Sequence, residues 1–228
     1  SSEIVASYQD VLDISYYQKP NSGPGDSRNF GMSLAKGNYY IILDSDVLLP
    51  PDYLEHVSAF LKHSYVDCFG GADAAHHSFT NLQKAINYTM TSFLTTGGIR
   101  GNTKGVQEFE PRSFNMGISR KAFEATQGFA KIHPGEDPDI SQRIIKAGFE
   151  TAFIPGAAVF HKRRVSWRSF AVQVYKFGMV RPILNKWHPD ASKITFWFPT
   201  LYIFFALGSL LLGIFYIQLL HLNNNLSS

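Results

Sequence analysis

Two acidic residues lie where an α/β sheet would bind a ligand. Asp44-Ser45-Asp46 directly follows the apolar run 39–43. Open α/β sheets bind ligands at the carboxyl ends of their strands, and carboxylate oxygens suit Mg²⁺ or Mn²⁺. The triplet could therefore hold a divalent cation through Asp44 and Asp46, with further ligands from a diphosphate and water. A solvated turn is the alternative, because Asp-x-Asp triplets also arise by chance.

A second acidic group stands in Gly135-Glu136-Asp137-Pro138-Asp139. We expect Asp137 to be the N-cap of a helix that closes near Gly148. The positive end of a helix favours the ionised carboxyl group, so Asp137 could accept a proton from an attacking hydroxyl. A purely structural cap is the alternative.

Arg28-Asn29 and His161 are weaker candidates. Arg28 and Asn29 stand near the start of a predicted helix after a Gly/Pro loop, where an anionic or hydroxyl-rich ligand could bind, although an ordinary capped surface helix is the alternative. His161 ends a predicted strand and could add an imidazole to a metal held by carboxylates, although a structural histidine is the alternative. The chain has no G-x-S-x-G, Walker or paired C-x-x-C motif, so hydrolase, nucleotide triphosphatase and zinc-site interpretations have no support.

Strands that alternate with helices must position these residues. We expect strands at 39–43, 66–69, 151–154 and 157–161, with the first buried in the centre of the sheet. Helices are expected between them, including one over 79–95 and one capped by Ser119. This alternation predicts an α/β layered domain over residues 1–165. The single cysteine, Cys68, lies in an apolar run and is expected to be a buried structural thiol.

Charge divides the chain into three zones. Residues 1–160 have a net charge of −4, residues 161–193 have +7, and residues 194–228 contain no Lys, Arg, Asp or Glu. Residues 196–220 are long and apolar enough for a transmembrane helix. The basic segment 166–193 is expected to form an amphipathic interfacial helix, with Trp167, Phe170, Val174 and Phe177 on its lipid-facing side. The positive-inside rule then places residues 1–193 in the cytoplasm, and a basic zone beside a span argues against nucleic-acid binding.

The order of these motifs resembles family 2 glycosyltransferases, which have the Rossmann-like GT-A fold. The similarity lies in residues 23–31, 35–37, 39–46 and 50–54 for the donor half, and in 114–120, 128–129, 135–137 and 143–148 for the acceptor half. It covers about residues 1–165. The basic segment and the span resemble membrane-anchored enzymes of bacterial exopolysaccharide assembly, which implies the inner membrane.

The resemblance implies a role for each candidate residue. Asp44 and Asp46 match the pair that holds Mg²⁺ or Mn²⁺ on the donor diphosphate, and His161 matches a third metal ligand. Arg28 and Asn29 match a pair beside the nucleotide-sugar. Asp137 matches the catalytic base, with Glu136 as its neighbour. The implied reaction transfers a sugar, with inversion, from a nucleotide-diphospho-sugar to a saccharide acceptor, which we expect to be lipid-linked.

Two departures from the family pattern keep alternatives open. The family's first strand and its acidic nucleotide-binding segment would lie before Ser1, so we expect the chain to be truncated at its N-terminus. Without half of the nucleotide pocket, it could be inactive alone. The Q-x-x-R-W motif of processive synthases is absent, since only Trp167-Arg168 and Gln173 occur, in another order. A processive synthase and a non-catalytic, membrane-tethered GT-A module are therefore alternatives to single-sugar transfer.

Overall fold

The computed structural model describes residues 2–74, 76, 78–92, 109–161, 166–192 and 194–226. We also expect residues 97–105 to form a loop that contributes to the choice of donor sugar, and these residues lie outside the described ones. In chain order the described residues form α1 (Ser2–Ala6), α2 (Pro24–Leu34), β1 (Tyr39–Leu43), β2 (Val47–Leu48), α3 (Tyr53–His63), β3 (Cys68–Ala74), α4 (Asn81–Thr91), β4 (Asn115–Ser119), α6 (Arg120–Thr126), α7 (Glu136–Lys146), β5 (Thr151–His161), α8 (Trp167–Trp187), the 3₁₀ turns η1 (Pro189–Ala191) and η2 (Ile194–Trp197), and α9 (Phe198–Leu226).

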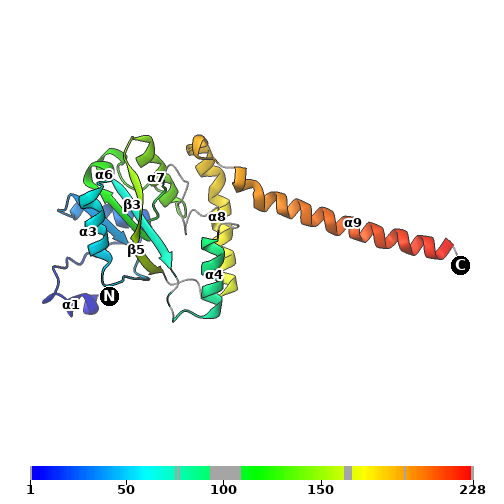
Figure 1. The fold of residues 1–228 in the computed structure, drawn as a ribbon, viewed down its shortest axis with the longest axis horizontal. Helices are drawn as coiled ribbons and strands as arrows, with labels where there is room; N and C mark the ends of the chain where they lie inside the picture. Colours follow the sequence, from blue (N-terminus) through cyan, green and yellow to red (C-terminus); the bar gives the residue numbers. More distant parts are fainter. Residues whose placement is uncertain are drawn as a thin grey trace.

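The strands form one mixed sheet in the order β1-β4-β3-β5-β2 (Figure 1). β3 and β5 are parallel, and the other neighbouring pairs are antiparallel. The two strands predicted at 151–154 and 157–161 are one strand, β5, because its pairing with β3 continues past an irregularity between Gly71 and Asp73. The predicted α/β class is confirmed.

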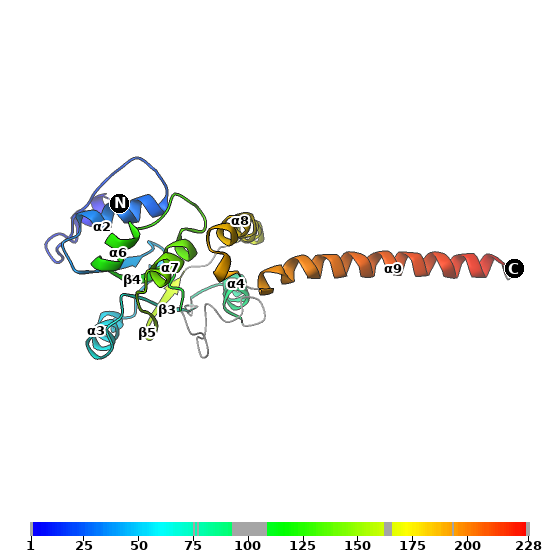
Figure 2. The same cartoon turned by 90° about the horizontal axis from the view of Figure 1, so that it is seen from above.

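Helices cover both faces of the sheet (Figure 2). On one face α2, α6 and α7 enclose a core that contains Met32, Cys68, Met116, Ile118 and Ile140. On the other face α3 packs on β3 and β5 through Tyr53 and Val57. The Cys68 thiol is fully buried, and burial raises its pKa, which confirms the predicted structural role. The Ser119 cap is also confirmed, since its hydroxyl accepts a hydrogen bond from the backbone of Ala122.

Strand β1 lies at an edge, not in the centre of the sheet as its apolar sequence predicted. Among the described strands it pairs only with β4. Its burial therefore alternates: Tyr40 and Ile42 face the core, whereas Ile41 and Leu43 are exposed. The acidic triplet still follows this strand directly.

Helix α7 begins two residues earlier than predicted. Gly135 is the N-cap, with a φ of 117° that favours glycine, and Glu136 is the first helical residue. Asp137 is thus inside the first turn and not the cap, and Pro138 is tolerated there because first-turn N–H groups lack helical partners. Three acidic side chains of this turn, Glu136, Asp137 and Asp139, lie at the positive end of the helix.

The C-terminal part consists of α8 beside the domain and α9 extending from it (Figure 1). The buried residues of α8, Val180 and Leu184, share a helical side with Phe170 and Phe177, which are half-buried. Of the predicted lipid-facing residues, Phe170 and Phe177 thus lie on the side turned toward the protein, whereas Trp167 and Val174 are exposed. The opposite side exposes a stripe of large apolar residues at three- and four-residue spacing: Val172, Tyr175, Met179, Ile183 and Trp187.

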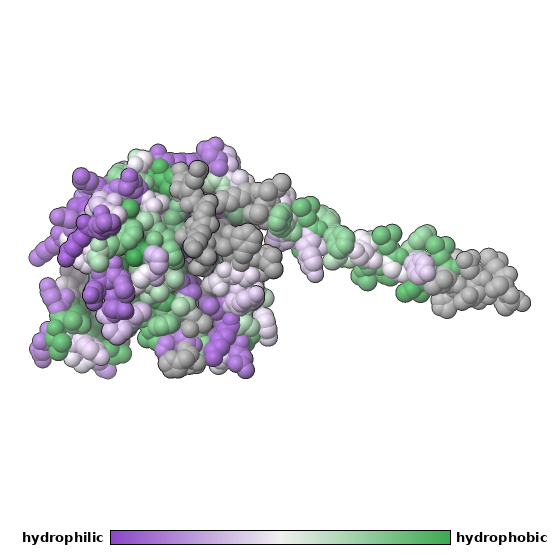
Figure 3. Space-filling view, viewed as in Figure 1, coloured by the Kyte–Doolittle hydropathy of each residue, from purple (hydrophilic) through white to green (hydrophobic). Residues whose placement is uncertain are grey.

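Helix α9 has the length and composition of a membrane span. Residues Phe198–Leu219 have a mean hydropathy of 2.1, and none of that stretch is buried inside the protein. Its apolar surface is visible along the rod in Figure 3. A helix of 22 residues is about 33 Å long at 1.5 Å per residue, which matches a ~30 Å hydrocarbon core.

Candidate active site

The acidic triplet forms a turn between β1 and β2. The backbone N–H of Val47 donates to the carbonyl oxygen of Asp44 at 3.3 Å. β2 then pairs with the end of β5, with Val47 opposite His161. The backbone register therefore brings the residue after Asp46 beside His161, as a shared metal site would require. The His161 side chain is outside the described part of the structure.

The donor set fits a cation that takes most of its ligands from a substrate. Asp44 and Asp46 supply hard carboxylate oxygens on one turn, with Asp44 about one-third exposed and Asp46 exposed. Among the described residues no three His, Cys, Asp or Glu side chains form a metal cage. Mg²⁺ is commonly bound through one or two carboxylates plus substrate phosphates, so two carboxylates suit an ion that arrives with a diphosphate.

Arg28 joins the two acidic motifs. It projects from α2, which begins after Gly23 with Pro24 in its first turn. Its Nη2 donates to Asp44 Oδ1 at 2.8 Å, and its Nη1 donates to Glu136 Oε1 at 3.2 Å and lies 4.0 Å from Asp137 Oδ1. Burial alone would lower the pKa of Arg28, but the hydrogen bond to Asp44 and the three negative charges raise it. The guanidinium therefore stays charged and holds both motifs at one place.

Asn29 contacts the protein backbone. Its Nδ2 donates to the carbonyl oxygen of Phe129 at 2.9 Å, and its Oδ1 accepts from the N–H of Phe129 at 2.8 Å. Gly25, one turn earlier in α2, approaches the same segment, because a Cβ there would lie 3.1 Å from the Cβ of Phe129. Asn29 thus fixes the loop that leads to α7.

The two acidic residues that open α7 differ in their environments. Glu136 is only 6% exposed and contacts Arg28 and the Nδ1 of His133, at 3.1 Å. Asp137 is 26% exposed, and its buried Oδ1 accepts no hydrogen bond from the described residues. Glu136 is therefore held by structural partners, whereas Asp137 keeps a carboxylate that an incoming hydroxyl could use.

Asp139, which sequence reasoning did not single out, is the most constrained acid of the site. Its Oδ2 accepts hydrogen bonds from Arg143 at 3.0 and 2.6 Å, and its Oδ1 lies 2.9 Å from Nε2 of His188. The i,i+4 spacing of Asp139 and Arg143 was a signal that could have suggested the first contact. Nothing in the sequence placed His188, 49 residues away, beside it.

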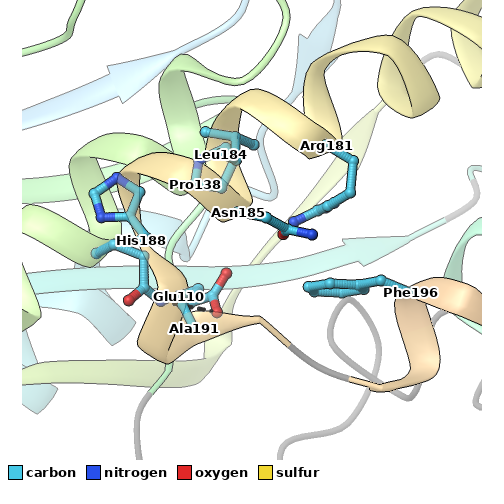
Figure 4. Close-up of a pocket in the computed structure, with 9 residues that line it drawn as sticks. Glu110, Pro138, Arg181, Leu184, Asn185, His188, Ala191 and Phe196 are labelled. Atoms are coloured by element: carbon cyan, nitrogen blue, oxygen red, sulfur yellow. Dashed lines mark hydrogen bonds between the residues drawn. The ribbon is translucent and has the colours of Figure 1, made fainter.

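A small cavity lies between α7 and α8, behind the first turn of α7 (Figure 4). Its lining includes Glu110, Pro138, Arg181, Asn185 and His188. Its volume of about 20 Å³ holds about one water molecule, far below the several hundred Å³ of a ligand pocket. The cavity is therefore a small gap in the packing of α7 against α8 and is too small to bind a sugar.

Comparisons with known proteins agree with this geometry. The family model described as "Glycosyl transferase family 2" matches residues 1–126, more than half of the 228 residues. The pre-mycofactocin glycosyltransferase of Mycobacterium tuberculosis is 24% identical over 198 residues, which cover 79% of this chain and 39% of that protein. The chain thus spans about two fifths of the length of the curated relatives that it matches.

Solved structures show the same fold at low identity. The mannosyltransferase PcManGT of Pyrobaculum calidifontis, in complex with GDP-Man and Mn²⁺, has a TM-score of 0.56 at 14% identity, covering 88% of this chain and 55% of that one. S. aureus TarS 1–349, in complex with UDP-GlcNAc, has a TM-score of 0.51 at 16% identity, covering 72% and 46%. With an acidic turn after β1, an acidic first turn of α7 and the family match over residues 1–126, the chain belongs to glycosyl transferase family 2 and has the GT-A fold.

Proposed function

We propose that this chain is the catalytic part of a glycosyltransferase that moves a sugar, with inversion, from a nucleotide-diphospho-sugar to a lipid-linked saccharide at a bacterial inner membrane. The observation that carries the proposal is the bridge made by Arg28. It brings the acidic turn after β1 and the first turn of α7 to one place. A donor-diphosphate site and a proton acceptor are thereby adjacent, as a transfer between two bound substrates requires.

Asp137 is the proposed base. It would take the proton of the acceptor hydroxyl while that oxygen attacks the anomeric carbon from the face opposite the diphosphate, and the bond to the diphosphate oxygen breaks. Arg28 and Glu136 fix the position of this turn, and Asn29 holds the loop before it. Bound Mg²⁺ or Mn²⁺, at Asp44 and Asp46 with His161 as a proposed third ligand, would offset the charge of the leaving diphosphate.

Nucleotide-sugars are the proposed donors because fold neighbours bind them: UDP-GlcNAc in TarS and GDP-Man with Mn²⁺ in PcManGT. Asn29 already bonds Phe129 through both ends of its amide, so Asp44 is the better-placed side chain, and it would meet the anionic diphosphate through the bound cation. Arg28 is a proposed second contact once the diphosphate approaches Asp44.

The membrane is the proposed second partner. Helix α9 would span it, and the exposed stripe of α8 from Val172 to Trp187 would lie in the interface next to the basic residues Arg168, Lys176 and Lys186. The excess of Lys and Arg before the span puts the catalytic domain on the cytoplasmic side under the positive-inside rule. The site would then face acceptors carried by the membrane.

The test uses the full-length natural protein in lipid nanodiscs, with UDP-glucose, UDP-GlcNAc and GDP-mannose as donors and with or without Mn²⁺. We expect Mn²⁺-dependent release of a nucleoside diphosphate and calorimetric binding of UDP or GDP. Asp46→Asn should remove both the Mn²⁺ dependence and most of the nucleotide affinity, whereas Asp10→Asn, at an exposed residue far from the turn in sequence, should change neither. Mn²⁺-dependent turnover by Asp46→Asn would contradict the metal assignment, and nucleotide binding without turnover would favour a non-catalytic module.

Asp137→Asn separates the base from a structural role. Asparagine keeps the size of the side chain but cannot accept the acceptor's proton, so kcat should fall about 10²–10⁴-fold while nucleotide affinity is retained. A kcat near that of the natural protein would mean that another residue is the base. Products longer than one added sugar would favour the processive alternative.

A further inference from the structure

The membrane-proximal helix α8 packs directly on the turn that carries the proposed base. Its buried residues, Val180 and Leu184, and the following His188 are spaced four apart and lie on one side. All three meet the start of α7. A Cβ on Gly135 would lie 3.0 Å from a methyl group of Val180 and 3.5 Å from one of Leu184. The left-handed turn at Gly135 is therefore in direct contact with α8, with no room for a side chain between them.

His188 holds the same turn from its other side. Its Nε2 lies 2.9 Å from Oδ1 of Asp139, and the two side chains are 8% and 3% exposed. The second oxygen of Asp139 binds Arg143, which also donates to the carbonyl oxygens of Thr126 and Gly128. A buried carboxylate with hydrogen bonds at both oxygens has one orientation. Asp139 is two residues after Asp137, so this network fixes the backbone that carries Asp137.

The chain continues from this contact into the membrane span. His188 caps the C-terminal end of α8, and Phe198 begins α9 ten positions later. Between them Phe196 lies under the guanidinium of Arg181 of α8, with 4.0 Å between the guanidinium carbon and the ring centre (Figure 4). Lys146 and Asp190 add a contact of 3.6 Å that is largely exposed and contributes little. The segment that leads into α9 thus packs on α8, the same helix that contacts the start of α7.

We propose that His188 is a positioning residue for sugar transfer, and that α8 sets the orientation of Asp137 through Val180, Leu184 and the His188–Asp139 hydrogen bond. The membrane anchor and the base are then parts of one rigid unit. This inference rests on the proposed function for its kinetic consequence only. Its structural consequence, a first turn of α7 that depends on His188, holds whether or not the chain is an enzyme.

The experiment compares His188→Leu, His188→Gln and Asp190→Asn in the full-length protein in nanodiscs. Leucine leaves Oδ1 of Asp139 buried without a donor, whereas the Gln amide nitrogen can take the place of Nε2. Asp190→Asn removes the exposed contact next to it and is the matched control. Amide hydrogen exchange across residues 136–140 reports the turn, and UDP binding with Mn²⁺ reports the donor half. The kcat, measured with whichever of UDP-glucose, UDP-GlcNAc and GDP-mannose is turned over, reports whether Asp137 is correctly placed for proton transfer.

We expect His188→Leu to speed exchange across residues 136–140 at least tenfold and to lower kcat at least tenfold, with UDP affinity within twofold of the natural protein. His188→Gln should recover most of both losses, and Asp190→Asn should match the natural protein. Unchanged exchange in His188→Leu would overturn the inference. Faster exchange with unchanged kcat would overturn the positioning role and leave a structural contact. If His188→Leu does not fold, Val180→Ala, which thins the contact on Gly135, must reproduce the same pattern.

If no donor is turned over by the natural protein, the proposed function fails and the exchange data alone decide the inference. A uniform rise of exchange over the sheet as well as α7 would also overturn it, because the effect would then be global unfolding.

Discussion

Replacing Arg28 with Met tests the idea that one guanidinium holds the two acidic motifs together. The Arg28 side chain is 14% exposed, and its partner Glu136 is 6% exposed. Without Arg28, the buried Glu136 keeps only His133 among the described ion-pair partners. Removing one member of a buried ion pair costs about 3–5 kcal/mol. Because His133 remains and water reaches Asp44, we expect a loss near the lower end, about 3 kcal/mol. That loss corresponds to a fall in Tm of roughly 6–12 °C for a domain of this size.

A double-mutant cycle measures the origin of this loss. Arg28→Met, Glu136→Gln and the double variant are unfolded by heat in the same detergent, with far-UV circular dichroism as the probe. If the cost comes from a buried, unpaired carboxylate, neutral Gln relieves it. The double variant should then be less destabilised than the sum of the single variants by about 1–2 kcal/mol. Strictly additive losses would refute the reasoning. Lys19→Met, which breaks the more exposed pair with Asp26, is the control and should leave Tm nearly unchanged.

Three further predictions concern packing, ionisation and the membrane. Gly117→Ala should destabilise the protein by about 1–3 kcal/mol in urea unfolding, because the added Cβ would lie 2.0 Å from the buried ring of Phe69. Gly31→Ala is the control and should not destabilise it, because Gly31 has open space around it. Burial raises the pKa of Tyr53 to about 12, so the stabilisation by its protonated hydroxyl is complete below the unfolded pKa near 10 and is lost as the pH rises toward 12. The stability of Tyr53→Phe relative to the natural protein should therefore rise between about pH 10 and 12. An unchanged difference would contradict the burial of the hydroxyl. In a variant with Trp167 and Trp197 replaced by Phe, we expect lipids brominated near the headgroup to quench the fluorescence of Trp187. Quenching by the aqueous agent acrylamide alone would exclude α8 from the membrane interface.

Local sequence signals predicted most of the fold. The strand 39–43, the Ser119 cap and the long apolar helix α9 each depend on neighbouring residues, and the structure contains all three. Errors arose where the answer depended on distant partners. The apolar sequence of β1 cannot tell an edge from a centre, because that depends on which strands pair beside it. The choice between Gly135 and Asp137 as the cap depended on a left-handed turn that packs against Val180 and Leu184.

The candidate site shows the same division. The motifs of Asp44, Glu136 and Asp137 could be recognised because they are local, and in the structure the three side chains gather around Arg28. The roles of Asn29 and Asp139 could not be found this way. Asn29 bonds the backbone of Phe129. Asp139 bonds His188, which belongs to a segment that was predicted only as a membrane-interface helix. Similarly, the side of α8 that faces lipid depends on which side the domain covers, which composition alone does not fix.

The close approach of α2 to the loop before α7 also limits how this part of the sequence can evolve. A Cβ at Gly128 would lie 2.2 Å from Oδ1 of Asn29, and Gly128 has a φ of 71°, so a larger residue there displaces the Asn29 amide. Loss of Asn29 removes both hydrogen bonds to Phe129, but a Cβ at position 128 would still lie 2.7 Å from the ring of Phe123. Glycine should therefore persist at position 128 in descendants of this sequence even where Asn29 has changed, and loss of Asn29 alone should weaken the loop before α7.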